Sequence, residues 1–267
     1  SFDLEYITQS PHIAVITSLF SDHLNRYVSF ASYIKAKMRI VRFQKRGDRA
    51  VIWRSDVAAR YLPRHFSRVA WVGNRSIAHL PRGISWRVAR PSIGLAEKAV
   101  REAGVAKKTF WEKARSFESP PGRLEIIARK SGRVFINDTT ATNPGAAMYS
   151  VRALADHFAL KRPDLLTIVT GGEDKKFPSG EIRKYAEALE RCRARVILIP
   201  GSFSDKLRRR LTRAAITAGT LEEAIIKAGE KTGVIALVPA AASFNMFKNE
   251  FHRAEVFYKA VRQWRGA

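Results

Sequence analysis

Five short apolar runs in the second half of the chain alternate with longer segments that carry apolar residues at helical spacing. The runs are Leu124–Ala128, Arg133–Asn137, Leu165–Thr170, Arg195–Ile199 and Val234–Val238. The helical segments are Pro144–Phe158, Ser179–Arg191, Leu221–Lys231 and Asn249–Trp264. Continuous apolar runs of this length indicate strands that are buried on both faces. Their alternation with helices predicts an α/β fold, in which helices cover both sides of a mostly parallel sheet.

The first half of the chain repeats this pattern with fewer elements. Strands are predicted at Ile13–Thr17, Ala50–Trp53 and Val69–Val72, and helices at Ser29–Arg42, Ser92–Ala103 and Lys108–Arg115. Between the halves, Ser119-Pro-Pro-Gly122 disrupts both helix and strand, because proline lacks a backbone donor and glycine adds freedom. We therefore predict one domain over residues 1–119 and another over residues 120–267, lengths that suit two ordinary domains.

Cysteine use and hydropathy limit the environments that suit the chain. Cys192 is the single cysteine, which excludes an internal disulfide and a thiolate metal cluster and fits a reducing cytoplasm. No run of about 18 apolar residues suggests a membrane span, and no secretory signal opens the chain. We therefore expect a cytoplasmic protein without a membrane partner. Because Ser1 stands where a methionine would begin a gene product, we also expect a processed or truncated chain.

A formal net charge of +24 is the strongest compositional feature. It favours a polyanionic partner, either a nucleic acid or a nucleotide-linked substrate, and the alternative is a generally basic surface. The basic residues are scattered, and neither zinc-finger spacing nor an RNA-recognition signature accompanies them. We do not expect specific nucleic-acid binding. A basic nucleic-acid-binding module remains an alternative that predicts steeply salt-dependent binding.

Polar residues follow four of the predicted strands of the second half. The turns are Asn137–Asn143, Gly171–Lys176, Pro200–Ser202 and Pro239–Asn249. Ligands of parallel sheets bind where strands end, so we expect the first, second and fourth turns to share one rim. A rim with Asp138, Thr142, Lys175 and Ser243 would suit a small zwitterionic or dicarboxylic ligand. The alternative is ordinary turn chemistry, which uses the same residue types.

Seven landmarks, in chain order, resemble motifs of the Mur ligase family. In the first half, Ser1–Glu5 resembles "SSFQLE", and Asp22–Tyr27 followed by Ala31–Lys37 resembles "DHLDRH" followed by "F-x-A-Y-x-x-AK". In the second half, Pro121–Glu125 resembles "PHRLE", Phe135–Pro144 resembles "IND(S/T)KATNP", Gly171–Lys175 resembles "GG-x-x-K", and Pro239–Asn249 resembles "SPACASFDMFKN". The Ala-Thr-Asn-Pro and Phe-Lys-Asn versions are similar to the D-glutamate-adding branch of the family.

The resemblance implies an ATP-dependent amide ligase that adds D-glutamate to UDP-N-acetylmuramoyl-L-alanine in peptidoglycan synthesis. The implied reaction passes through an acyl phosphate and uses ATP and Mg²⁺. The implied fold is the second half of a central ATPase domain followed by a Rossmann-like, amino-acid-binding domain. By position, His23 and Lys37 (as a carbamate) match the catalytic metal site, and Arg123 and Asp138 match ATP contacts. Residues around D-glutamate are matched by Thr142, Lys175, Ser243 and Phe244.

The chain also departs from the family pattern. It contains no G-x-x-x-x-G-K-[ST] phosphate loop and no uridine-diphosphate-binding domain, so we expect a separate chain or a missing segment to supply them. Thr140 replaces a lysine and Gly122 a histidine, while Ser18 and Asn25 replace an asparagine and an aspartate. The usual "GxHNxxN" segment is unrecognisable around Arg87–Ser92, and Glu250-Phe251 reverses the usual order.

Four expectations follow from these departures. Losing a lysine that faces developing negative charge could raise the barrier by roughly 2.7–4 kcal/mol. We therefore keep a non-catalytic, ligand- or partner-binding relative as an alternative. We expect no catalysis from the 267 residues alone, and exposed sheet edges in residues 1–119.

Overall fold

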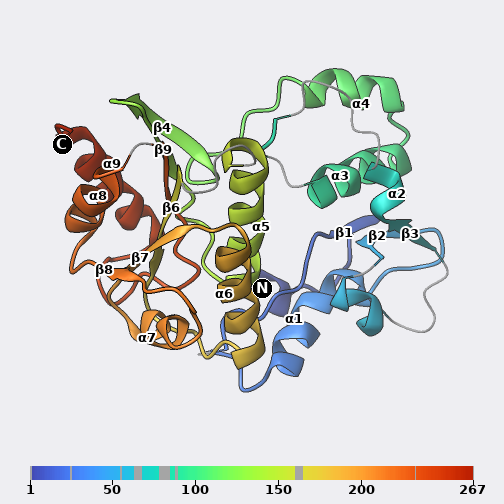
Figure 1. Cartoon of the computed structure of the whole chain (residues 1–267). Coiled ribbons are helices and arrows are strands. Elements are labelled where there is room, and N and C mark those ends of the chain that lie inside the picture. Colours follow the sequence, from blue (N-terminus) through green and yellow to red (C-terminus); the bar gives the residue numbers. More distant parts are fainter. Residues whose placement is uncertain are drawn as a thin grey trace. The chain divides into compact units, whose positions relative to one another are not determined.

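The computed structural model describes residues 2–24, 26–54, 56–62, 68–77, 85–87, 90–159, 165–231 and 233–266. The chain divides into two compact units, Ser1–Glu118 (unit 1) and Ser119–Ala267 (unit 2). The division lies directly before the Ser119-Pro-Pro-Gly122 segment. Figure 1 shows the elements of each unit with the labels used below.

Unit 1 contains a parallel sheet in the order β1-β2-β3, formed by β1 (Ile13–Ile16), β2 (Arg49–Trp53) and β3 (Val69–Val72). Successive side chains of a strand point to opposite faces. On one face, Ala14, Ile16 and Ile52 pack against α1 (Phe30–Arg42). On the other, Val15, Val51 and Trp53 pack with Leu95 of α3 (Arg90–Glu102). The sheet is therefore covered on both faces, as the apolar runs predict.

The smaller elements of unit 1 are η1 (Asp3–Glu5), η2 (Val57–Tyr61), α2 (Asn74–Ile77) and α4 (Lys107–Ala114). Helix α1 begins at a capping box, in which the side chains of Ser29 and Ser32 each bond the other's backbone N–H. Among the described strands, β1 pairs with β2 alone, so its other edge has no partner there.

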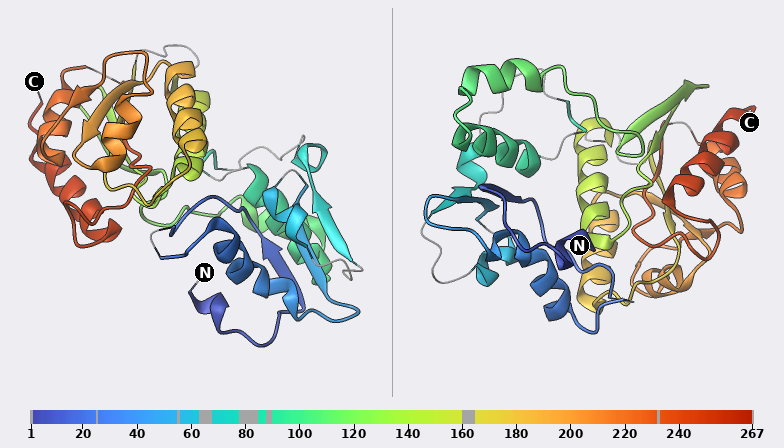
Figure 2. Two further views of the ribbon diagram at one scale, coloured as in Figure 1. Left: turned by 90° about the horizontal axis from the view of Figure 1, so that it is seen from below. Right: turned by 180° about the vertical axis from the view of Figure 1, so that it is seen from behind.

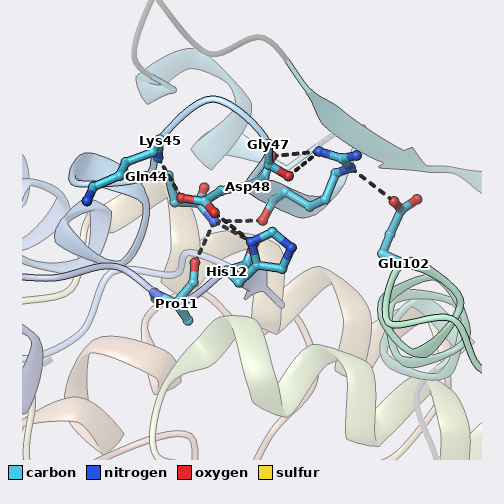
Figure 3. Close-up of polar contacts among 8 residues, drawn as sticks. Pro11, His12, Gln44, Lys45, Gly47, Asp48 and Glu102 are labelled. Carbon is cyan, nitrogen blue, oxygen red and sulfur yellow. Dashed lines mark hydrogen bonds and ion pairs between the residues drawn. The ribbon is translucent and has the colours of Figure 1, made fainter.

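A polar network fixes the turn between α1 and β2 (Figure 3). The Gln44 side-chain amide donates to the carbonyl oxygens of Pro11, at 2.9 Å, and Arg49, at 2.7 Å. Asp48 accepts from the Lys45 amide and lies 2.6 Å from His12 Nδ1. These bonds connect the starts of β1 and β2. They also provide donors for backbone carbonyl oxygens such as that of Pro11.

Unit 2 contains a six-stranded sheet in the order β4-β5-β9-β6-β7-β8. Its strands are β4 (Glu125–Lys130), β5 (Arg133–Asn137), β6 (Leu166–Gly171), β7 (Arg195–Ile199), β8 (Ile216–Thr217) and β9 (Gly233–Leu237). Only the β4–β5 pair is antiparallel. The predicted mostly parallel α/β sheet is confirmed. The sequence analysis missed β8, because two residues carry no periodicity.

Helices cover both faces of the unit 2 sheet (Figures 1 and 2). The helices are α5 (Pro144–Leu154) with a π-helical turn η3 (Ala155–Ala159), α6 (Ser179–Arg191), α7 (Ser202–Arg208), α8 (Leu221–Gly229) and α9 (Glu250–Gln263). Val169 and Leu237 pack toward α8 and α9. Thr170 faces the other side, where its hydroxyl lies 3.1 Å from that of Tyr185 on α6. The predicted cap of α5 is present, since the Asn143 side chain accepts from Ala146 N at 2.8 Å.

None of the helices in the described ranges is both long and apolar enough to cross a lipid bilayer.

Candidate functional site

The turns that follow β5, β9 and β6 meet at one end of the unit 2 sheet. The Ala240 amide donates to the Ala141 carbonyl at 2.8 Å, which joins the turn after β9 to the turn after β5. Glu173 and Ala242 exchange two backbone hydrogen bonds of 3.0 Å, which joins the turn after β6 to the same segment. The predicted convergence of the first, second and fourth turns is therefore present.

The turn after β7 joins this rim as well, which the sequence analysis did not foresee. Phe203 N donates to the Gly172 carbonyl at 3.0 Å, and the Asn245 side chain donates to the Pro200 carbonyl at 2.7 Å. A Cβ atom on Gly201, whose φ is +143°, would lie 2.1 Å from the Gly172 oxygen. Glycine at this position therefore lets two turns pack backbone against backbone. The Pro200-Gly201 dipeptide after a strand was the available signal.

A buried arginine on α9 connects two of the turns. Arg253 is fully buried, and its guanidinium donates to the Thr139 carbonyl at 2.8 Å, the Thr139 hydroxyl at 3.1 Å and the Ala241 carbonyl at 3.2 Å. Burial lowers the pKa of Arg253 to about 10. Arg253 was not among the residues selected from the sequence. Its signal was its helical spacing to apolar residues of α9, since Phe257, Ala260 and Val261 follow it at four, seven and eight positions.

The four residues matched to D-glutamate contacts lie on this rim but differ in exposure. Lys175 and Ser243 are buried, Thr142 is half-buried, and Phe244 is 66% exposed. Lys175 follows the Glu173–Ala242 bridge by two residues, and Ser243 follows it directly. A buried lysine on a rim that also carries hydroxyl side chains is suited to an anionic ligand. Phe244 presents an apolar ring at the outer surface of the same segment.

Asp138 and Arg123, matched to ATP contacts, are neighbours in unit 2. Asp138 is buried, and its Oδ1 accepts from the Leu124 amide at 3.0 Å. Its Oδ2 makes no hydrogen bond of ordinary geometry with the residues that the structure describes. Burial raises the pKa of Asp138 to about 7, against the lowering effects of the Ser150 hydroxyl, the Leu124 amide and the Arg123 charge. Arg123 is exposed, with its guanidinium available to an anion.

His23 and Lys37 lie near one tyrosine in unit 1. The His23 ring is 6.4 Å from the Tyr33 ring, and Lys37 Nζ is 5.5 Å from the centroid of that ring. The His23 amide donates to Asp22 Oδ1 at 2.8 Å, and His23 Nε2 is 3.9 Å from Asp22 Oδ2. Burial and then the Asp22 charge raise the pKa of the Tyr33 phenol. The adjacent Asn25, noted as a departure, lies outside the described residues, as does part of Arg87–Ser92.

Magnesium can be held by a cage of protein side chains, or mostly by water and phosphate oxygens. The described ranges hold no cluster of three or more His, Cys, Asp or Glu side chains, so they form no all-protein metal cage. Magnesium at phosphoryl-transfer sites, however, uses one or two carboxylates, with water and phosphate oxygens for the rest. Asp22 offers one carboxylate beside His23, and a carbamate on Lys37 would add an anionic oxygen.

Comparison with known sequences identifies relatives along the whole chain. Residues 3–80 match the model of the Mur ligase middle domain. The chain is 33% identical to the UDP-N-acetylmuramoylalanine–D-glutamate ligase of Acidobacterium capsulatum, over 100% of this chain and 62% of that protein. It is 30% identical to the enzyme of the same name from Roseiflexus sp., over 99% of this chain and 64% of that protein. The chain thus spans less than two thirds of the length of these relatives.

Two solved structures of ligases share this fold. A MurF ligase from Thermotoga maritima in complex with ADP superposes with a TM-score of 0.68 at 17% identity, covering 95% of this chain and 63% of that one. A pseudomurein peptide ligase type C from Methanothermus fervidus gives 0.65 at 17% identity, covering 94% and 63%. These likenesses show the fold, and the sequence matches show that the chain is similar to Mur ligases along its length.

Proposed function

We propose that this chain forms part of an ATP-dependent ligase that adds D-glutamate to UDP-N-acetylmuramoyl-L-alanine in the cytoplasm. The observation that carries the proposal is the rim of unit 2, where the segments bearing Thr142, Lys175 and Ser243 are joined by backbone hydrogen bonds. The names of the relatives supply the identity of the amino acid. Residues 1–119 would be the second half of the central ATP-binding domain, and residues 120–267 the amino-acid-binding domain.

In the proposed reaction, the buried Lys175 ammonium and the Ser243 hydroxyl hold the carboxylates of D-glutamate. A carboxylate oxygen of the uridine-linked substrate attacks the γ-phosphorus of ATP, which yields an acyl phosphate and ADP. The amine of D-glutamate then attacks the acyl carbon, inorganic phosphate leaves, and the nitrogen loses a proton. Arg123 would neutralise phosphate charge, since a guanidinium matches phosphate oxygens bidentately. Asp138 would contact the nucleotide.

For unit 1 we propose a magnesium site on His23 and on Lys37 as its carbamate, beside Asp22. Bound Mg²⁺ would neutralise charge on the phosphates. The chain carries no phosphate-loop motif, so that loop would come from a separate chain or another segment. We expect the 267 residues alone to bind ligands without turning them over.

Calorimetry on the 267-residue chain tests the amino-acid site directly. We expect saturable binding of D-glutamate and much weaker binding of L-glutamate, because the rim presents its donors in one chiral arrangement. Ser243→Ala should weaken D-glutamate binding, and Ser131→Ala, at the exposed turn between β4 and β5, serves as the control. Equal affinity for both enantiomers, or no heat with either, would contradict the proposal.

A non-catalytic relative is the second candidate, favoured by Thr140 and Gly122 at two positions where the family carries a lysine and a histidine. Fusing the chain to the preceding part of the Acidobacterium capsulatum relative would supply a phosphate loop. If this fusion releases ADP only when both the uridine-linked acceptor and D-glutamate are present, the hypothesis of a non-catalytic relative is wrong. Binding of D-glutamate without any ADP release would support it.

A further inference from the structure

Two of the departures from the family pattern, Thr140 and Gly122, contact each other. Thr140 Oγ1 donates to the Gly122 carbonyl at 2.8 Å, and the Thr140 amide reaches the same oxygen at 3.3 Å. Thr140 lies in the turn after β5, and Gly122 in the loop before β4. The residue that replaces a lysine therefore holds the residue that replaces a histidine.

Gly122 fits this contact because it has no side chain. It is buried, and its φ of +73° lies in the left-handed region that favours glycine. A Cβ atom there would lie 3.0 Å from Thr139 Cγ2 and 3.4 Å from Thr140 Cγ2. With threonines at 139 and 140, any larger residue at 122 must displace a methyl group and strain the backbone. The residue types at positions 122 and 140 are therefore linked by packing.

Hydrogen bonds also fix the backbone on both sides of Arg123. The Gly122 amide donates to Glu125 Oε2 at 2.8 Å, and the Leu124 amide donates to Asp138 Oδ1 at 3.0 Å. The Arg123 carbonyl accepts from Ser119 Oγ at 2.8 Å. Leu124, with a φ of +45°, adopts a conformation that a β-carbon disfavours. Such a conformation persists where the surrounding bonds determine it.

The Arg123 side chain contrasts with its backbone. It is exposed, and its charge acts on the buried Asp138 carboxyl. A fixed backbone beneath an exposed cation reduces the conformational entropy lost when an anion binds.

We propose that Gly122 and Thr140 form a coupled pair of positioning residues that holds the Arg123 loop ready for the phosphates of a nucleotide. The threonine at the family's lysine position thereby donates the hydrogen bond that preorganises the neighbouring arginine. The proposal rests on the proposed function, in which Arg123 binds ATP phosphate, and adds how this chain presents that arginine.

ATP binding to the full chain, followed by NMR titration, gives the first test. Thr140→Val removes the hydroxyl at nearly constant volume and should weaken ATP binding about threefold to tenfold, the value of one ordinary hydrogen bond. Thr140→Ser keeps the hydroxyl and should restore the affinity of the unaltered chain. Thr212→Val, at an exposed turn of unit 2, is the matched control and should change nothing.

A double-mutant cycle separates positioning from direct contact. Arg123→Gln should weaken ATP binding more than Thr140→Val does. In the Arg123→Gln background, Thr140→Val should have no further effect, because the hydroxyl acts through the arginine. An equal effect of Thr140→Val in both backgrounds would overturn the proposal. If Arg123→Gln binds ATP normally, the proposed function of Arg123 fails instead.

Amide hydrogen exchange tests the pair without any ligand. Thr140→Val should speed exchange at Arg123 and Leu124, while Thr140→Ser and Thr212→Val leave it unchanged. Unchanged exchange in Thr140→Val would overturn the positioning role even if ATP binding fell. If the unaltered chain does not bind ATP, the proposed function fails, and the exchange rates alone decide whether Thr140 fixes this loop.

Discussion

The Arg253 guanidinium donates a 2.8 Å hydrogen bond to the main-chain oxygen of Thr139, a residue 114 positions earlier in the chain. The same side chain reaches the Ala241 carbonyl at 3.2 Å. One fully buried cation thus joins the turn after β5 to the turn after β9, in the region where we place the amino-acid site. A planar group with five donors can bond several carbonyls at once, which lysine cannot do in the same geometry.

Replacing Arg253 with methionine should destabilise unit 2. The change keeps much of the buried volume but leaves the Thr139 and Ala241 carbonyls without their donor, at a cost of about 3 kcal/mol. Urea unfolding measures this difference. Arg262→Met, at an exposed position of the same helix, is the control and should change stability by less than about 0.5 kcal/mol. Similar unfolding midpoints for both variants would contradict the role of Arg253 in joining the turns after β5 and β9.

Asp138 should make unit 2 less stable as the pH rises toward neutrality. Burial raises its pKa to about 7 from an ordinary value of 3.8, so the folded state retains a proton that the unfolded state releases. The stabilisation is complete below about pH 4 and is lost as the pH passes about 7, an effect on the order of 2–4 kcal/mol.

Urea midpoints of the unaltered chain and of Asp138→Asn, compared between pH 5 and 8, isolate this contribution. The asparagine oxygen can still accept from the Leu124 amide, and the side chain cannot ionise. The stability difference between the two proteins should therefore shift in favour of Asp138→Asn as the pH rises. A difference that is constant across this range would show that Asp138 titrates normally.

Gly201→Ala should disrupt the rim. The added Cβ would lie 2.1 Å from the Gly172 oxygen, at a φ of +143°, so two turns must separate and the cost should be at least about 3 kcal/mol. Gly180→Ala is a matched control on α6, where a Cβ meets nothing within 4 Å. That change should raise stability by about 0.5–1 kcal/mol, since alanine favours the helix. Thermal unfolding of both variants checks the contrast.

Lys175→Met should weaken D-glutamate binding about tenfold to a hundredfold, the range for a hydrogen bond to a charged group. Lys175 is buried on the rim, whereas the next residue, Lys176, is exposed. Lys176→Met removes the same charge from the same turn and should leave binding almost unchanged. Calorimetry at moderate salt gives both affinities. Equal losses would indicate a general charge effect of the basic surface, not a site at Lys175.

Much of the fold followed from local pattern. Strand β3 and helix α6 have the predicted bounds, and the end of α9 differs from its prediction by one residue. Strand β8 and helix α7 were not predicted from the sequence, because elements of two and seven residues are too short to show a clear hydrophobic period. The helix predicted over Pro144–Phe158 is an α-helix to Leu154 and a π-helical turn beyond it. Its apolar spacing does not distinguish those two windings.

The sequence by itself determined the fold class, the lineage and the turns that carry polar residues, because hydrophobic period and motif order are local properties of the chain. Only the tertiary structure decided how those turns are held. In the sequence Arg253 is one of many basic residues, whereas in the structure it is buried and bonds both Thr139 and Ala241. In the sequence Gly122 and Thr140 are two separate replacements of family residues, whereas in the structure they are joined by a hydrogen bond. Contacts across many residues depend on burial and backbone geometry, which composition and periodicity do not record.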